Sequence, residues 1–286
     1  AQESRGLGDV YKRQLFEIKT RLSMAEEEKQ EQYVVLARKY RPQNFEDLLG
    51  QDALVQTLTN AINNNRLHHA YILTGIRGVG KTTTARLIAK ALNCTGPDGS
   101  GGPTTHPCGI CENCKSIAAG RNIDVLELDA ASRTGVDDIR DILDGVRYKP
   151  TNCRYKIYII DEVHMLSKSA FNALLKTLEE PPAHVKFIFA TTEIRKVPVT
   201  VLSRCQRFDL QRLSIEDLLK LFNKIIAAED LKADDEALHM IATAADGSAR
   251  DGLSLLDQAI SLGGGKVRID IVKDCLLYTS PSPRDS

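Results

Sequence analysis

The sequence predicts an α/β fold in which a five-stranded parallel sheet is covered by helices and followed by a small helical domain. Three observations predict it. A glycine-rich phosphate loop, GIRGVGKT at 75–82, stands between a short apolar run and a helical pattern. Up to about residue 212, apolar strand-like runs alternate with segments of helical spacing. Beyond that residue the helical spacing continues with no strand between the helices.

The elements of the first domain follow from these patterns in order. Residues 157–160 read IYII, an apolar run typical of a parallel-sheet strand buried on both faces. A predicted helix that begins at Lys168 is stopped by Pro181 and Pro182. The full set of expected strands is 70–73, 124–128, 157–160, 187–190 and 207–210, and the expected helices are 52–63, 82–92, 136–146 and 168–178. Helical spacing at 215–228, 234–245 and 249–261 predicts a three-helix second domain.

Composition restricts the class of protein. The chain has 286 residues, 42% of them hydrophobic, and its 38 basic residues balance 38 acidic ones, which disfavours a polycation that coats nucleic acid. It has neither an apolar run of ~20 residues nor a secretory signal, so we expect a cytoplasmic protein without membrane contact. Both ends fit no periodic pattern and resemble translated cloning sequence. We therefore expect a natural start at Met24, with 1–32 and 274–286 as a non-native or disordered leader and tail.

The phosphate loop carries the first chemistry. Gly75, Gly80, Lys81 and Thr82 complete its pattern, between a strand and a helix. Glycines let successive backbone N–H groups point at phosphates, and the N-terminus of the following helix adds positive potential. We expect Lys81 to reach the β- and γ-phosphates and Thr82 to bind Mg²⁺.

An acidic pair ends the apolar strand at 157–160. Asp161 is expected to hold Mg²⁺, and Glu162 to orient or deprotonate the attacking water, which favours a hydrolase over a kinase. The Asn-Lys-x-Asp sequence that reads guanine is absent, because Asn223 and Lys224 are followed by Ile225 and Ile226. Adenine is therefore the expected base.

Four further places in the sequence allow two readings each. Thr191 and Thr192 end the next strand, where a hydroxyl can bond the γ-phosphate or simply close a β-branched strand. Arg204, in Ser-Arg-Cys, is either an arginine finger that reaches a neighbouring subunit or an ordinary surface arginine. Arg250 starts a helix of the second domain, where it either senses the γ-phosphate or is solvated. Arg41 and Pro42 lie either over an adenine or on a solvated face.

Four cysteines have the spacing of a metal site. Cys94, Cys108, Cys111 and Cys114 form two overlapping CxxC steps with a fourth thiol at loop distance. Four protein ligands leave no open position, so we expect a structural metal. Zinc fits best, an iron–sulfur cluster is the alternative, and a redox dithiol comes third. His106 is a possible competing ligand, and the remaining cysteines are read as ordinary thiols: Cys153, Cys205 and Cys275.

Several longer runs resemble a known family. LARKYRPQNFEDLLGQ, HHAYILTGIRGVGKTTTAR, DAASRTGVDDIRDILD, YIIDEVHMLSKSAFNALLKTLEEPP and FIFATTEIRKVPVTVLSRCQRF, with the four cysteines, resemble the gamma/tau family of bacterial DNA polymerase III subunits. The resemblance covers about 33–272 and implies an AAA+ module at 33–212, a zinc module at about 94–114 and a helical lid at 213–273.

The resemblance also implies site residues. The phosphate-binding set is Gly75, Arg77, Gly78, Val79, Gly80, Lys81, Thr82 and Thr83, and Arg41 and Pro42 lie near the adenine. Asp161 and Thr82 hold Mg²⁺, the catalytic residues are Glu162, Lys81, Thr192 and, in trans, Arg204, and Arg250 is the sensor on the lid. The zinc ligands are Cys94, Cys108, Cys111 and Cys114.

The implied function is that of a motor. Members of this family use ATP to load a sliding clamp onto primer–template DNA. They belong to a DNA-directed DNA polymerase, which is a transferase, and act close to the nucleoid. The implied partners are the other subunits of a hetero-pentamer and, through C-terminal regions of a long form, a polymerase core and a helicase. Because the sequence does not continue into the family's collar domain, we expect nucleotide binding but weak or absent assembly. The alternatives are another DNA-stimulated AAA+ ATPase and a non-catalytic scaffold subunit.

Overall fold

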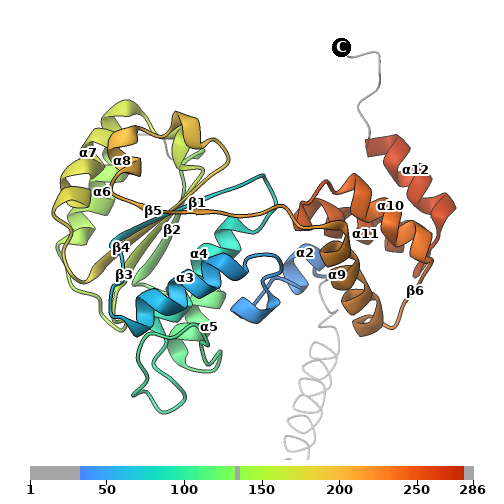
Figure 1. The fold of residues 1–286 in the computed structure, drawn as a ribbon, viewed down its shortest axis with the longest axis horizontal. Helices are drawn as coiled ribbons and strands as arrows, with labels where there is room; N and C mark the ends of the chain where they lie inside the picture. Colours follow the sequence, from blue (N-terminus) through green and yellow to red (C-terminus); the bar gives the residue numbers. More distant parts are fainter. Residues whose placement is uncertain (1–32, 133–135, 280–286) are drawn as a thin grey trace, which may run out of the picture.

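The structure, a computed structural model, describes residues 33–132 and 136–279. It consists of a sheet domain and a helical domain that lie side by side (Figure 1). The expected leader 1–32, the proposed start at Met24 and the tail from 280 onward lie outside the described residues.

The described part of the sheet domain contains the predicted five-stranded parallel sheet, in the order β2-β3-β4-β1-β5. Two of the three inner strands, β1 and β4, are buried along their whole length, as expected where helices cover both faces. Each strand lies within two residues of its predicted bounds: β1 Ala70–Thr74, β2 Val125–Asp129, β3 Lys156–Asp161, β4 Val185–Thr191 and β5 Gln206–Asp209.

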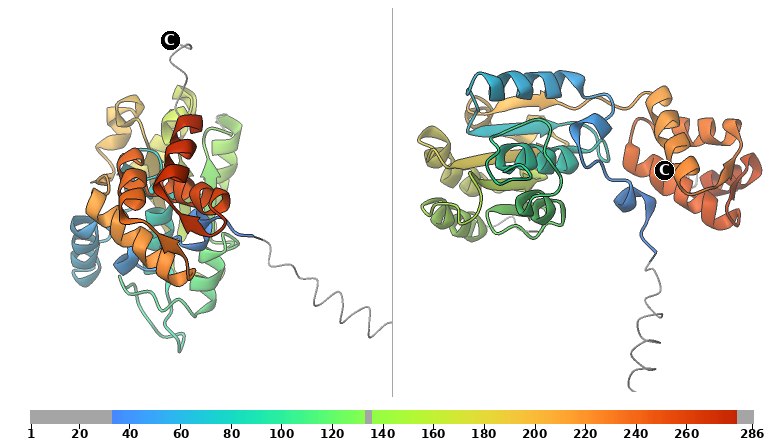
Figure 2. Two further views of the ribbon diagram at one scale, coloured as in Figure 1. Left: turned by 90° about the vertical axis from the view of Figure 1, so that its right-hand side faces the viewer. Right: turned by 90° about the horizontal axis from the view of Figure 1, so that it is seen from below.

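Helices cover both faces of this sheet (Figure 2). One face carries α3 Asp52–Asn63, α4 Lys81–Asn93 and α5 Glu112–Ala118; the other carries α6 Val136–Val146, α7 Lys168–Glu179 and α8 Val199–Leu202. The short helices α5 and α8 were not predicted, because they have too few turns to show a periodic pattern. Three single 3₁₀ turns complete the domain: η1 Phe45–Asp47, η2 Val163–Met165 and η3 Ile194–Lys196.

A buried carboxylate fixes the connection that leads into β3. Asp124 is 2% exposed, and its two oxygens accept the backbone N–H groups of Thr151 (2.8 Å), Asn152 (2.7 Å) and Cys153 (2.9 Å). Three donors shared by one ionised group form a set of charge-assisted hydrogen bonds. The loop at 151–153 is therefore tied to the start of β2.

Asp124→Ala is expected to lower the free energy of unfolding by about 3 kcal/mol, because three backbone N–H groups lose the buried, ionised acceptor that they share. Chemical denaturation of both proteins measures this difference. Asp144→Ala removes an exposed carboxylate from α6 and serves as the matched control. An Asp124→Ala protein as stable as that control would contradict the role of this carboxylate.

The helical domain, here called the lid, contains one helix more than expected. Alongside α9 Ile215–Ala228, α10 Asp235–Ala244 and α11 Ala249–Leu262, the described residues include a fourth helix, α12 Ile269–Thr279. A two-residue parallel bridge, β6 Lys232–Ala233 with β7 Lys266–Val267, joins two of the connections. The tail from 274 was expected to be non-native or disordered, and disorder is wrong for 274–279. Cys275 is 4% exposed in the lid core, so packing orders this stretch.

The segment before the sheet domain packs on the lid, although the predicted boundary assigned it to the sheet domain. Leu36, in α2 Leu36–Lys39, is part of the buried lid cluster. Asp257 of α11 accepts the backbone N–H of Leu36 (3.4 Å) and the hydroxyl of Tyr33. Lys39 forms an ion pair of 2.6 Å with Glu229. Burial of Leu36 against α11 decides this placement, and the chain thus crosses from the lid to the sheet.

Candidate nucleotide site and metal centre

The residues of the predicted nucleotide site meet at the carboxyl ends of three neighbouring strands. The register pairs Thr74 of β1 with Thr191 of β4, and Ile160 of β3 with Phe189 of β4. The phosphate loop follows Thr74, and the acidic pair begins at Asp161. Parallel strands place their carboxyl ends at one edge, where ligands of open α/β sheets bind.

The phosphate loop has the backbone that a phosphate cradle requires. Gly80 has a φ of 109°, which side chains rarely allow, and a Cβ added there would meet no heavy atom within 4 Å. The space beside Gly80, at the N-terminus of α4, is therefore open to a ligand. Val79 differs from its neighbours, because its side chain is buried in the core and anchors the loop.

Lys81 lies inside the loop that it is expected to serve. Its Nζ donates to the carbonyl oxygens of Gly75 and Ile76, both at 3.0 Å. Burial lowers the pKa of Lys81, while the carboxylates of Glu162 and Asp161 act to raise it. Lys81 is 6% exposed, so water screens the charge of its ammonium group only weakly, and an anion in the loop would be attracted strongly. Arg77 is exposed at the tip of the loop.

The acidic pair faces the start of α4. The hydroxyl of Thr82 donates to Asp161 Oδ2, and Asp161 Oδ1 accepts the backbone N–H of Glu162 at 2.9 Å. Hydroxyl and carboxylate oxygens are the ligands that Mg²⁺ takes from proteins, so this donor set fits magnesium. Glu162 has a φ of 47°, a strained value for a residue with a side chain, and such strain gathers at functional sites.

The Glu162 carboxylate is held by residues at the end of β4. Its Oε2 accepts the Thr192 hydroxyl at 3.1 Å and the Thr192 backbone N–H at 3.4 Å. The ring of His164, which is 6% exposed, also contacts this oxygen, with Nδ1 at 3.4 Å. The sequence analysis gave His164 no role, although it ends the run IYIIDEVH that supplied the acids.

The lid closes directly on the phosphate loop. The backbone N–H of Arg250 donates to the carbonyl of Gly78 at 3.3 Å, and a Cβ added at Gly78 would lie 2.1 Å from Ser248 Oγ. Ser248 caps α11 by accepting the N–H of Asp251 at 3.2 Å. Glycine at 78 therefore permits the close approach of the lid. The sequence had predicted Arg250 at this site but not Ser248.

Arg41 and Pro42 line a small pocket along α4 with Thr83. The Nζ of Lys90 fastens the segment by donating to the carbonyl of Gln43 at 2.7 Å. Burial lowers the pKa of Arg41, and the neighbouring charges of Arg86 and Arg250 act in the same direction. The contact of Arg41 with an adenine stays a prediction.

Arg204 lies far from the other predicted site residues. It precedes β5, whose Gln206 is paired with Tyr71 near the amino end of β1, whereas the phosphate loop follows the carboxyl end of β1. The guanidinium donates to Glu179 Oε1 at 2.6 Å and to the Thr200 carbonyl at 2.5 Å. A side chain near the amino ends of the strands cannot reach a nucleotide bound at the phosphate loop of the same chain. Any role of Arg204 as an arginine finger would therefore be toward the nucleotide of a neighbouring subunit.

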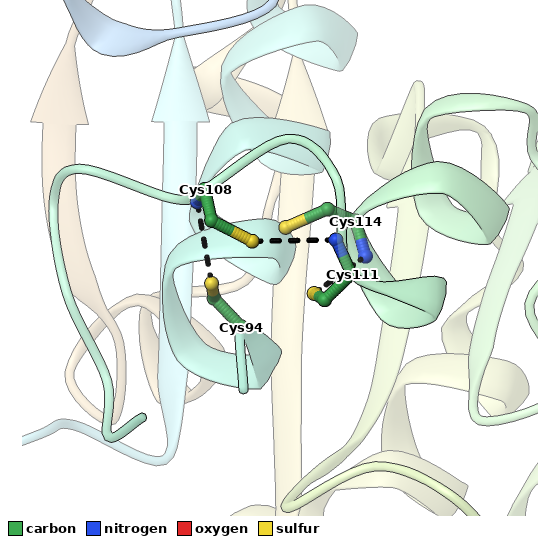
Figure 3. Close-up of side chains that lie close together, drawn as sticks. All are labelled: Cys94, Cys108, Cys111 and Cys114. Carbon is green, nitrogen blue, oxygen red and sulfur yellow. Dashed lines mark hydrogen bonds between the residues drawn. The ribbon is translucent and has the colours of Figure 1, made fainter. Parts of the chain in front are cut away.

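The four predicted cysteine ligands come together at the end of α4 (Figure 3). Their Sγ atoms all lie within 4.8 Å of one another, and in the described residues the group contains these four alone. Four thiolates around one zinc ion at ~2.3 Å lie ~3.8 Å apart, so the arrangement fits one ion better than a larger iron–sulfur cube. His106 instead lies 3.4 Å from Glu46 Oε1.

Backbone groups support the thiolate form of this cluster. Cys94 Sγ accepts N–H groups from Gly96 (3.4 Å) and Cys108 (3.3 Å), and Cys111 Sγ accepts the N–H of Cys114 at 3.4 Å. Burial acts to raise the pKa of Cys111, but hydrogen bonds from Thr95 and Cys114 bring it to about 6. Burial raises the pKa of Cys114 instead, so these hydrogen bonds favour the thiolate at Cys111 but not at all four positions.

The cluster is joined to the helix that carries the phosphate loop. Cys94 is the C-cap of α4, whose first residue is Lys81. Arg154 donates to the carbonyl oxygens of Leu92 (2.5 Å) and Gly101 (2.6 Å), which fastens the loop at 95–107 to the end of α4.

The fold and this site define the class of protein: an AAA+ P-loop nucleotide-binding module with a helical lid. A family model described as DNA polymerase III, delta subunit, matches residues 50–214, and one described as DNA polymerase III clamp loader subunit, ATPase lid domain, matches 218–265. The chain belongs to the DNA polymerase III gamma/tau family of clamp loader subunits.

Curated relatives support this membership. The chain is 53% identical over 244 residues to DNA polymerase III subunit tau of Salmonella typhimurium, covering 85% of the chain and 37% of the relative. It is 51% identical over 247 residues to the Bacillus subtilis tau subunit, covering 86% and 42%. With the gamma subunit of Buchnera aphidicola subsp. Acyrthosiphon pisum the identity is 50% over 244 residues, covering 85% and 66%. The chain thus spans well under half the length of the two tau relatives.

Solved structures agree on the fold. The Thermotoga maritima RuvB Holliday junction branch migration motor superposes with a TM-score of 0.60 and 19% identity, covering 84% of this chain and 72% of that one. At this identity the likeness shows the fold alone. No helix in the described part of the chain is long and apolar enough to cross a membrane.

Proposed function

We propose that this chain is an ATP-hydrolysing motor module of a clamp loader, which loads a sliding clamp onto primer–template DNA in the bacterial cytoplasm, close to the nucleoid. One observation carries the proposal. The predicted nucleotide-site side chains lie together at the carboxyl ends of the strands, whereas Arg204 lies near the amino ends. An arginine that lies away from the phosphate loop of its own chain fits a ring of subunits in which each supplies an arginine finger to its neighbour.

Each residue has a part in the proposed reaction. The loop glycines and Lys81 bind the β- and γ-phosphates of ATP, and Arg41 with Pro42 lies against the adenine. Thr82 and Asp161 hold Mg²⁺, which neutralises phosphate charge when bound. Glu162 accepts a proton from the attacking water and Thr192 keeps its carboxylate in place.

The remaining parts of the proposal concern the lid, the zinc module and the partners. Arg250 reads the γ-phosphate and moves the lid when it is lost, and a structural zinc ion held by the four cysteines stabilises the end of α4. The proposed partners are other clamp-loader subunits, the sliding clamp and DNA, which would be bound through its backbone rather than its bases. In a long form, further regions would bind the polymerase core and a helicase.

Two experiments separate this proposal from its alternatives. A scaffold subunit would bind zinc but no ATP, and another DNA-stimulated AAA+ motor would bind ATP but no zinc. Zinc analysis and titration with a fluorescent ATP analogue, both on this chain, distinguish the three. Binding of both ligands is the expected result, and absence of ATP binding would contradict the motor.

Lys81→Ala is expected to weaken ATP binding about 10- to 100-fold, because a charge-assisted hydrogen bond to phosphate contributes about 1.5–3 kcal/mol. Titration with the same analogue measures it. Lys115→Ala removes an exposed lysine from α5 and is the matched control. Equal affinity in the two variants would contradict the placement of the phosphates at this loop.

A further inference from the structure

His164 is a buried histidine that the proposed reaction leaves without a role. It lies in η2, two residues after Glu162, and its side chain is 6% exposed. Buried ring nitrogens are stable only where they have polar partners, so the partners of this ring indicate its function.

The ring lies between two carboxylates and the end of β4. Nδ1 is 3.0 Å from Thr191 Oγ1 and 3.4 Å from Glu162 Oε2, and Nε2 is 3.5 Å from Glu193 Oε1. Glu193 in turn forms an ion pair of 2.8 Å with Lys196. The ring therefore has polar neighbours on both of its nitrogen edges.

We propose that His164 is a positioning residue for Glu162: it holds the carboxylate that activates water at the angle set by Thr192. Both residues contact the same oxygen, Oε2 of Glu162. Because Thr192 approaches from β4 and His164 from η2, the carboxylate is held between two elements. The inference deepens the proposed function and rests on it.

The ring itself is held by residues at the end of β4. The Thr191 hydroxyl oxygen accepts the backbone N–H of Glu193 at 3.0 Å, which holds that hydroxyl against Nδ1. A proton on Nδ1 points toward Thr191 and Glu162, whereas a proton on Nε2 points toward Glu193. Only a proton on Nδ1 lets the ring donate to the Glu162 carboxylate, so the positioning role requires the ring to carry that proton.

The backbone at Glu162 explains why its side chain needs this support. A left-handed residue persists only where its surroundings fix it. The N–H of Met165 donates to the Glu162 carbonyl at 2.9 Å, and this bond closes the tight turn that contains the ring. The turn sets the Cα of Glu162, while His164 and Thr192 set its carboxylate, and a base acts only within hydrogen-bond reach of its water.

The test measures ATP turnover and ATP affinity separately, in the full-length protein assembled with its partner subunits. His164→Ala is expected to lower kcat about 10-fold, part of the ~10²–10⁴-fold that a positioned base contributes, with an unchanged dissociation constant for ATP. His164→Asn keeps a polar atom near the position of Nδ1 and is expected to restore most of the rate. His184, partly buried with Nε2 3.1 Å from the Val146 carbonyl, provides the matched control His184→Ala.

Each outcome decides the matter. A wild-type complex without ATP turnover would contradict the proposed function before any variant is compared. Given wild-type turnover, a His164→Ala rate equal to or above wild type overturns the positioning role, as does a rate that His164→Asn fails to restore. If the His164→Ala protein does not fold, the Glu193→Gln variant tests the proposal instead. Glu193 is half exposed, so its substitution is compatible with folding. Glu193→Gln is expected to lower kcat about 3-fold, a small part of the contribution of a positioned base, with an unchanged affinity for ATP. An unchanged kcat in this variant overturns the proposal.

Discussion

Arg204→Ala is expected to lower the ATP turnover of the assembled complex about 10³- to 10⁵-fold, with little change in the affinity of each subunit for ATP. The reason is geometric. Arg204 lies at the amino end of β5, whereas the phosphate loop lies beyond the carboxyl end of β1. An arginine finger neutralises the charge that develops on a neighbour's γ-phosphate, so its loss affects the rate and not the binding of the ground state.

In the isolated chain the same arginine is paired within the subunit. Its bond to Glu179 joins partly exposed groups, and such a pair contributes at most about 1 kcal/mol. A neighbour's phosphate can therefore displace Glu179 at small cost. Arg204→Ala should leave the thermal stability of the chain nearly unchanged, which separates a catalytic loss from unfolding.

The measurement is steady-state ATP turnover in the presence of clamp and primed DNA. Arg207→Ala is the matched control, because Arg207 lies on β5 itself, is half exposed and pairs with Asp209 at 2.7 Å. It is expected to turn over ATP at the wild-type rate. Turnover of the Arg204→Ala complex at that same rate would contradict a role in trans.

Removal of the metal from the cysteine cluster is expected to have the largest effect on stability. Structural zinc sites bind with an apparent free energy of ~10–16 kcal/mol at neutral pH, and that energy is coupled to folding. Cys94 and Arg154 join the cluster to the end of α4, so its loss should loosen more than the loop at 95–107. A chelator, or Cys114→Ser, should lower Tm by more than about 10 °C.

Thermal unfolding and zinc analysis of the same samples test this expectation. Cys153→Ser is the matched control, since Cys153 is a partly buried thiol outside the cluster with Sγ 3.5 Å from Asn122 Oδ1. The control should keep one zinc ion per chain and the wild-type Tm. A zinc-free chain with an unchanged Tm would show that the four cysteines do not support the fold.

Much of the fold could be predicted because its signals are local. The strand at 157–160 is a continuous apolar run, and the helix at 136–146 was predicted with the bounds that the structure shows. The failures have the opposite cause. Neither α5 nor α8 is long enough for a periodic pattern, and α12 is ordered by the burial of Cys275 against its neighbours. Leu36 shows the same effect, because its contacts with the lid are distant in sequence.

The sequence by itself determined the chemistry of the site. A phosphate loop, an acidic pair and a set of four cysteines are each composed of residues close in the chain, so their spacing suffices to predict them. Contacts between distant segments were decided by the tertiary structure alone. The pairing of β3 with β4 brings Thr192 next to the carboxylate of Glu162, which His164 also contacts. The lid packs Ser248 against Gly78, and Arg204 lies near the amino end of β5, away from the phosphate loop. Strand register and domain packing set these distances, and neither is a property of a short stretch of chain.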